Sequence, residues 1–212
     1  MMIDFEAVLR HFWPKALRAI HDYHDYEVEN DRKALRALCN KNLPASARMA
    51  CLVKWFRSYA VFLGVTTPEG LRIAEAVLVW ADERNPSRDL TTAKALADAH
   101  AELMKVVCQA YGKKHQFTSL ASKALWLCYP ESVPMFDSYG RNALSVICKM
   151  EMVLTPISEK RPEYEEFVHV WKQLYEMHKE TIENLDIGAY SYRVRVFDRV
   201  LWLIGQRSFH TD

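Results

Sequence analysis

The sequence lacks several features that would mark it as fibrous, secreted or membrane-spanning. Only 6 of its 212 residues are glycine, and it contains no internal repeat and no segment of low complexity. No run of about 18 apolar residues exists to span a membrane. Asp4 and Glu6 interrupt the early apolar run that a signal peptide requires. Because half of the residues are hydrophobic, we expect a compact, helix-rich globule.

An excess of charge of one sign is also missing. The 28 basic side chains are balanced by 27 acidic ones, which gives a formal net charge of +1. This balance weighs against non-specific binding to a polyanion, although a local basic patch can exist within a balanced total.

Closely spaced cysteine pairs are absent as well. The cysteines are odd in number and mostly lie inside apolar helical patterns, which indicates reduced residues of a cytoplasmic protein. No zinc or iron–sulfur spacing occurs, so we expect no metal and no cofactor. His21 and His24 are three residues apart, but no third ligand follows, and a solvated helix end is the preferred interpretation. The cysteines are Cys39, Cys51, Cys108, Cys128 and Cys148.

What the chain does contain is a helical pattern along most of its length. Apolar residues recur at intervals of three and four, and no segment alternates clearly enough to predict a strand. Capping residues, prolines and glycines divide the pattern into helices. We therefore expect one all-α domain over residues 1–212, with a last helix that ends at Gly205.

The most informative stretch is residues 117–144. Residues 124–129 are all apolar or aromatic, so we expect a helix that is buried on every side, with Lys123 at its N-terminal edge. Pro130 stops this helix. Asp137 then stands at an N-cap position before the next helix. An amine and a carboxylate at the starts of two adjacent helices can share one cleft.

This stretch resembles the core of the helix-hairpin-helix superfamily of DNA base-excision glycosylases, and most closely the 8-oxoguanine DNA glycosylase branch. In that family a hairpin reading Leu-Pro-Gly-Val-Gly-Thr-Lys leads into a buried helix, and a Val-Pro segment with an aspartate opens the next helix. Residues 117–123 are similar to the hairpin, and residues 133–137 are similar to the Val-Pro segment with one residue added. The resemblance implies a glycosylase-like fold of two helical lobes around a cleft.

The resemblance also implies roles for two residues. The family lysine attacks the sugar C1′ and forms a Schiff base, which corresponds to Lys123; the family aspartate helps to expel the base, which corresponds to Asp137. The chemistry agrees, since burial and a helix N-terminus both disfavour a charged amine, and N-cap amides stabilise a carboxylate. The alternative interpretation is an ordinary N-cap and a solvated lysine.

The chain departs from the family pattern at the hairpin. Ser119 and Ala121 replace the two glycines, whose freedom lets the backbone donate amides to a DNA phosphate. We therefore expect weak duplex binding that depends on side chains such as Lys113, Lys114 and Arg141. Asp137 lies 14 residues after Lys123, a gap shorter than usual by about one helical turn.

Three aromatic residues are candidates for stacking on a base that has been flipped out of a helix: Trp126, Tyr139 and Trp202. At helical spacing, aromatic residues are more often part of the core.

Several arginines are candidates for contact with phosphate. Arg141 follows Asp137 by one turn, where an ordinary i,i+4 ion pair is the alternative. Arg193, Arg195 and Arg199 recur along the last helix, where a solvated face is the alternative.

Two functional hypotheses follow. The first is a nucleic-acid base glycosylase with lyase activity, acting on a modified or oxidised base of DNA in base excision and DNA repair. The second is a non-catalytic module of the same fold that binds a nucleotide, a modified base or a protein partner, as in bacterial anti-phage defence, which divergent glycosylase-like proteins also resemble. The sequence leaves the oligomeric state open.

Overall fold

The computed structural model describes residues 4–22, 25–83, 89–113, 115–150 and 164–208. Within these ranges the chain forms ten helices and no strand, so the prediction of an all-α protein is confirmed. The helices are α1 (Phe5–Asp22), α2 (Asp25–Cys39), α3 (Ala45–Ser58), α4 (Thr67–Glu83), α5 (Ala93–Tyr111), α6 (Thr118–Cys128), α7 (Ser138–Met150), α8 (Tyr164–Met177), α9 (Lys179–Asn184) and α10 (Arg193–Ser208).

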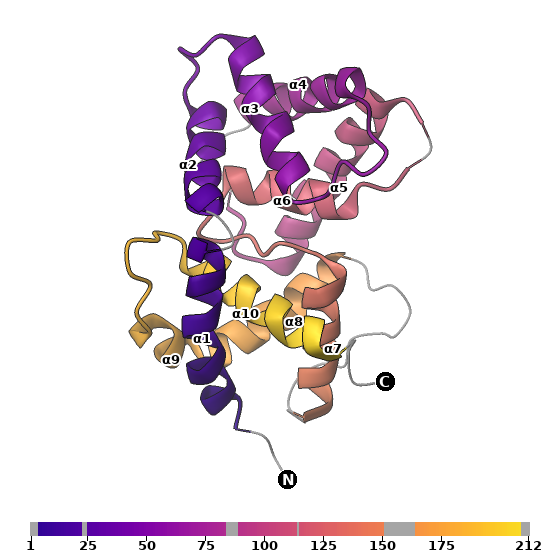
Figure 1. The fold of residues 1–212 in the computed structure, drawn as a ribbon. Helices are drawn as coiled ribbons and strands as arrows, with labels where there is room; N and C mark the ends of the chain where they lie inside the picture. Colours follow the sequence, from indigo (N-terminus) through magenta and orange to yellow (C-terminus); the bar gives the residue numbers. More distant parts are fainter. Residues whose placement is uncertain (1–3, 23–24, 84–88, 114, 151–163, 209–212) are drawn as a thin grey trace.

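The helices form two groups (Figure 1). One group contains α2 to α6, in which α3 packs on α2 and α4, and α5 packs on α4 and α6. The other contains α1 and α7 to α10, in which α10 packs on both α7 and α1. Contacts of α5 with α8 and of α1 with α2 join the two groups.

Helix α6 is buried on every side, as its sequence predicts. Every residue from Leu120 to Leu127 is buried, including the polar side chains of Ser122 and Lys123. The indole of Trp126 stacks against that of Trp55 in α3, with ring centroids 6.2 Å apart. Burial of this apolar surface removes α6 from water and makes it part of the hydrophobic core.

A histidine fixes the start of α6. His100 in α5 is 3% exposed, and its Nε2 lies 2.9 Å from the carbonyl oxygen of Thr118. Burial lowers the pKa of His100 to about 4, so its neutral ring must carry the proton on Nε2 in order to donate. The ring also stacks on Tyr164 of α8, at a centroid distance of 4.0 Å.

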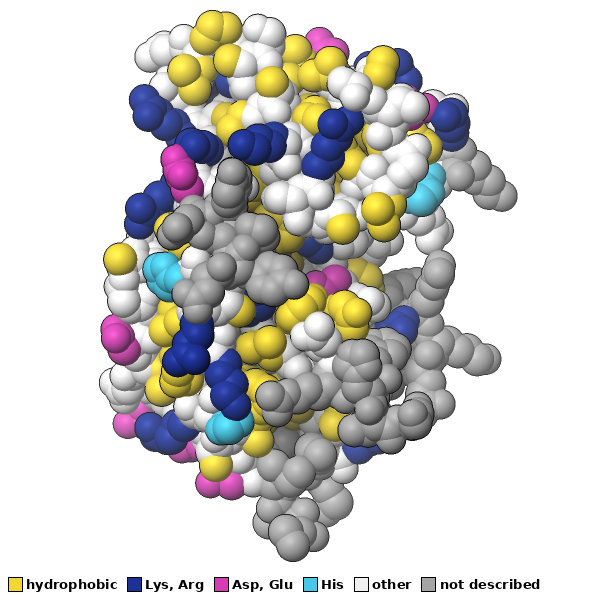
Figure 2. All heavy atoms as spheres, in the orientation of Figure 1, with side chains coloured by type: hydrophobic (Ala, Val, Ile, Leu, Met, Phe, Trp, Pro, Cys, Tyr) yellow, Lys and Arg dark blue, Asp and Glu magenta, His cyan; other side chains and the backbone are white. Residues whose placement is uncertain are grey.

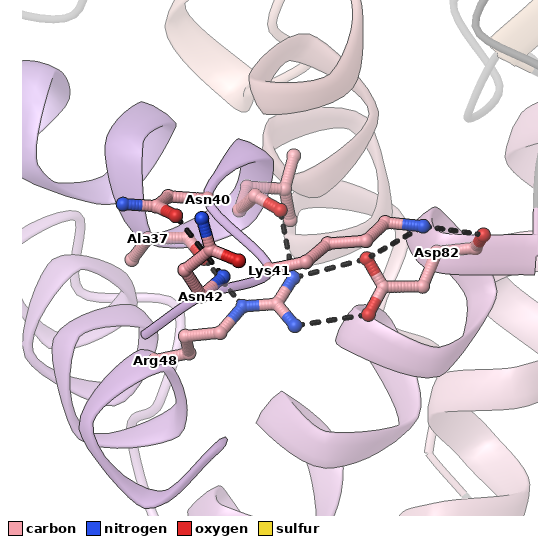
Figure 3. A network of polar contacts seen from close by, with 7 residues as sticks. Ala37, Asn40, Lys41, Asn42, Arg48 and Asp82 are labelled. Carbon is pink, nitrogen blue, oxygen red and sulfur yellow. Dashed lines mark hydrogen bonds and ion pairs between the residues drawn. The ribbon is translucent and has the colours of Figure 1, made fainter. Parts of the chain in front are cut away.

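An arginine joins α2, α3 and α4 at the far end of the first group (Figure 3). Arg48 is 6% exposed and donates to the carbonyl oxygens of Ala37 and Leu38 at the end of α2. The same guanidinium forms a bidentate pair with Asp82 of α4, at 2.9 and 3.0 Å. It therefore supplies donors to the last turn of α2, which has no intrahelical partner for its carbonyls.

The expected end of α10 at Gly205 is wrong, because the helix continues to Ser208. A Cβ at position 205 would lie 1.9 Å from the carbonyl oxygen of Tyr139. Glycine is required here by the close approach of α7 to α10, and it does not act as a helix stop. This contact brings together two of the helices that carry candidate site residues.

Gly205→Ala should therefore destabilise the protein by at least about 2 kcal/mol, because the new methyl group meets backbone atoms that must shift. The matched control is Gly140→Ala in α7, where the nearest atom to the added Cβ is 3.4 Å away. That control should gain or lose less than about 1 kcal/mol. Urea unfolding measures both. Equal stabilities of the two variants would show that α7 and α10 do not need to approach so closely.

Candidate functional site

A pocket of about 700 Å³ lies between the two groups of helices. Side chains of α1, α6, α7 and α10 line it, together with residues at the end of α3 and in the connections before α6 and α7. Figure 2 shows the surface hollowed between the two groups, with basic and acidic side chains visible in the hollow. The volume is within the range of small-molecule sites, about 300 to 1,000 Å³.

Lys123 and Asp137 both line this pocket. Lys123 is 4% exposed, and its Nζ donates a hydrogen bond of 2.7 Å to the Oγ of Ser119, one turn earlier in α6. The same Nζ lies 5.9 Å from the ring centroid of Tyr59. The amine is therefore inside the protein and faces the pocket.

Burial lowers the pKa of the Lys123 amine. The nearby guanidinium groups of Arg195 and Arg199 lower this pKa further, while the carboxylates of Asp137 and Asp198 oppose the shift. A lower pKa increases the neutral, nucleophilic fraction of the amine near neutral pH.

The expected place of Lys123 at a helix N-terminus is wrong. Helix α6 begins at Thr118, so Lys123 lies five residues beyond the first residue of the helix. Because the field of a helix end falls off within the first turn, burial replaces it as the main cause of the shifted pKa. Of residues 117–123, which resemble the family hairpin and its lysine, all but Phe117 are thus already helical.

Asp137 caps α7, as the sequence predicts. Its Oδ1 accepts a hydrogen bond of 2.7 Å from the amide of Gly140, the third residue of the helix. The preceding residue, Phe136, donates its amide to the Oγ of Ser122 at 3.0 Å. This bond ties the segment before α7 to α6 and sets Asp137 beside the helix that carries Lys123.

A second bond holds the same segment from the other side. The amide of Met135 donates to Oδ2 of Asp198 in α10 at 2.9 Å, and Trp171 donates to Oδ1 at 2.9 Å. Burial raises the pKa of Asp198 to about 7, although these two donors and Arg195 stabilise its charged form. Asp198 thus links the segment to α8 and α10.

Two arginines of α10 line the pocket, and the alternative of a solvated face is wrong for them. Arg195 is 5% exposed and donates to the hydroxyl of Tyr59 at 3.1 Å. Arg199 is 8% exposed, and its guanidinium lies 4.7 Å from the ring centroid of Trp202. Arg193 points elsewhere, because it donates to the carbonyl oxygens of Ile182 and Leu185.

Tyr59 is a pocket residue that the sequence did not indicate. Its hydroxyl donates to Oδ1 of Asp31 at 3.0 Å and accepts from Arg195. Asp31 is 1% exposed and also accepts from Trp55 and Tyr190. These groups come from α2, α3, α10 and the segment before α10, so no local pattern could reveal them. For the arginines a signal existed, since positions 195 and 199 are one turn apart on one face of the last helix.

Two of the three aromatic candidates line the pocket, and the third belongs to the core. Tyr139 and Trp202 line the pocket and form an edge-to-face pair, with centroids 5.3 Å apart. Trp126 does not line it, because its ring is fully buried between Trp55 and Tyr192. The expectation that Trp126 stacks on a base is therefore corrected: it is a core residue.

Of the candidates for phosphate contact, some line the pocket and others do not. Ser119 lines the pocket and accepts from Lys123. Ala121 is fully buried, and its amide donates to the carbonyl of Phe117, so it is not available to a phosphate. Lys113 is exposed and pairs with Glu69 at 2.5 Å, outside the pocket.

Of two further candidates, one lies outside the pocket lining and the other lies outside the described residues. Arg141 is half-buried and does not line the pocket, and among the residues that the structure describes no ion pair joins it to Asp137. Lys114 lies outside the described residues.

Comparison with known proteins gives no match: no family model, no curated protein and no solved structure is similar to this chain. None of the described helices is long and apolar enough to cross a membrane. Among the same residues, no group of three or more His, Cys, Asp and Glu side chains is arranged to hold a metal ion.

The burial of Lys123 makes a prediction about stability. Lys123→Met should stabilise the protein by about 1 to 3 kcal/mol near pH 7, because it removes a charge from the interior. The pKa of Lys123 in the folded protein lies below the ordinary value of 10.5. The free energy of unfolding of the parent should therefore increase as the pH rises toward 10.5, because the amine loses its proton more readily in the folded state than in the unfolded state. The difference in stability between Lys123→Met and the parent should shrink accordingly.

Urea unfolding of both proteins near pH 7 and near pH 10 measures this change. Lys113→Met is the control, because that amine is exposed and its pKa is raised by the ion pair with Glu69. An advantage of Lys123→Met that stayed constant with pH would contradict a desolvated amine at position 123.

Proposed function

We propose that this protein is a nucleic-acid base glycosylase with lyase activity, in which Lys123 is the nucleophile and Asp137 stabilises the reacting sugar. The observation that carries the proposal is a lysine amine that is 4% exposed and faces a pocket whose wall also contains an aspartate. The sequence resemblance of residues 117–137 to helix-hairpin-helix DNA glycosylases supports the same assignment.

The reaction starts with the neutral amine. Nζ attacks C1′ of the nucleotide, a bond forms between Nζ and C1′, and the glycosidic bond breaks, so the base leaves with the electron pair and takes up a proton. Loss of a proton from nitrogen and opening of the sugar ring give an imine. The imine makes the hydrogen on C2′ acidic, and its removal expels the 3′ phosphate, which is the lyase step.

In this proposal Asp137 supplies electrostatic assistance. Positive charge develops on the sugar as the base departs, and a carboxylate on the pocket wall stabilises that charge. The hydrogen bond from Gly140 fixes the orientation of this carboxylate. Ser119, which accepts from Nζ, holds the amine in place between turnovers.

The pocket wall also favours binding of a base. Tyr139 and Trp202 offer aromatic surface next to the charged groups, and a base released from its stack can pack against such rings. This combination also supports the alternative function, a binding module without catalysis. The two functions differ in whether a covalent intermediate forms.

Borohydride trapping tests the proposal. Incubation with DNA that contains an abasic site or oxidised guanine, together with borohydride, should reduce the imine to a stable amine and give a covalent protein–DNA species. Lys123→Met should abolish this species, while Lys113→Met, which removes an exposed lysine outside the pocket, should retain it.

Asp137→Asn should leave the protein folded, since asparagine is also a good N-cap. Base release should nevertheless slow by about 10²-fold or more, because the carboxylate charge is lost. Chromatography of the released base measures this rate. If the parent traps no DNA across a panel of lesions, or if Lys123→Met traps as well as the parent, the catalytic proposal fails and the binding module is favoured.

A further inference from the structure

An exposed arginine lies beside the pocket on each of the two groups of helices. Ala19 of α1 and Ser58 of α3 both line the pocket. Arg18 and Arg57 precede these two residues in the same helices, and both side chains are exposed. Consecutive residues of a helix point about 100° apart, so the two guanidinium groups lie on the outer surface next to the lining and not inside the pocket. Figure 2 shows basic side chains on both sides of the hollow.

Both arginines can contact a ligand from solvent. Among the residues that the structure describes, no ion pair involves either side chain. Arg57 donates to the hydroxyl of Thr67 through one terminal nitrogen, at 2.9 Å, which leaves the rest of its planar fork for another acceptor. The sequence contains no acidic residue from position 45 to position 68, so α3 and the loop after it contribute only basic charge, including that of the exposed Lys54.

We propose that a single strand of nucleic acid crosses the mouth of the pocket, with one phosphate on Arg18 and another on Arg57. The proposal rests on the proposed function in one respect, because it names the form of nucleic acid from which the pocket takes its base. Binding of the strand requires no chemistry at Lys123.

The two arginines fit a strand that passes over the mouth of the pocket. A nucleotide whose base enters the pocket has a phosphate on each side of its sugar, and Arg18 and Arg57 flank the lining from its two sides in the same way. Guanidinium groups bind phosphate oxygens through parallel hydrogen bonds. Such contacts position a strand without reading its sequence. Because the chain has a net charge of only +1, attraction to a strand depends on a local arrangement of this kind.

A single strand suits this surface better than a duplex. Of the groups that the sequence indicated for contact with a duplex, Ala121 is buried with its amide bonded to the carbonyl of Phe117, and Lys113 pairs with Glu69 outside the pocket. A base of a single strand is already unpaired. It therefore reaches the aromatic wall of the pocket without the cost of unpairing.

The salt dependence of strand binding tests the proposal on the full chain. Fluorescence anisotropy measures the affinity for an undamaged, labelled DNA single strand, and for the corresponding duplex, between about 50 and 200 mM salt. The single strand should bind more tightly than the duplex at every salt concentration. The slope of log affinity against log salt should have a magnitude of at least about 1.4 on the single strand, which is the value for two phosphate contacts.

Variants assign the slope to its residues. Arg18→Met and Arg57→Met should each lower the magnitude of the slope by about 0.7, the contribution of one phosphate on a single strand, and the double variant should lower it by about 1.4. Replacement of both arginines by lysine should keep the slope, because the charge remains.

Arg72→Met is the matched control and should keep the slope of the parent. It removes an exposed arginine of α4 that neither lines the pocket nor adjoins a lining residue in the chain. Circular dichroism checks that each variant is folded, and the comparison of single strand with duplex on the parent protein stands without any variant.

Four results would overturn the proposal: tighter binding of the duplex, a slope that the folded double variant leaves unchanged, an equal loss of slope in Arg72→Met, or no binding of the single strand at about 50 mM salt. Failure of the proposed function is a separate outcome. A protein whose strand binding depends on Arg18 and Arg57 but that gives no borohydride adduct keeps this inference and loses the glycosylase. A protein that gives the adduct while the double variant binds like the parent keeps the glycosylase and loses this inference.

Discussion

The burial of Lys123 in the middle of α6 is the constraint on which the rest of the structure depends. A buried amine needs polar groups around it. Here Lys123 donates a hydrogen bond to the hydroxyl of Ser119 and lines a pocket that Asp137 also lines. The helix around it is otherwise apolar and buried on all sides. A lysine at this position costs stability, and the cost is accompanied by a lowered pKa of its amine. Stability and reactivity are thus linked in one side chain.

The surrounding helices act mainly to fix the geometry of this amine. Bonds from Phe136 to Ser122 and from Met135 to Asp198 hold the segment before α7 between α6 and α10. The glycine at position 205 allows α7 to approach α10, so that both contribute to the pocket. The pocket therefore lies where both groups of helices meet, and each group supplies part of its charge.

The sequence was sufficient to predict the helical class, the buried α6 and the Asp137 cap, because each depends on local spacing or on a single capping residue. It misplaced the start of α6 and the role of Gly205, since the first depends on how Phe117 and Thr118 pack and the second on a contact with α7. Tyr59 and its bond to Asp31 could not be predicted, because they join segments far apart in the chain. The two arginines of α10 were visible as part of an arginine series along the last helix, but only the fold shows that they face a pocket.

The most direct test of this account is the pKa of the Lys123 amine, measured by NMR titration of protein with isotope-labelled lysine and assigned with Lys123→Met. The account predicts that Lys123 titrates clearly below its ordinary value of 10.5, whereas Lys113, paired with Glu69, titrates above it. A Lys123 amine that titrates together with the exposed lysines would contradict the account, because it would show that the amine is solvated and has no special reactivity.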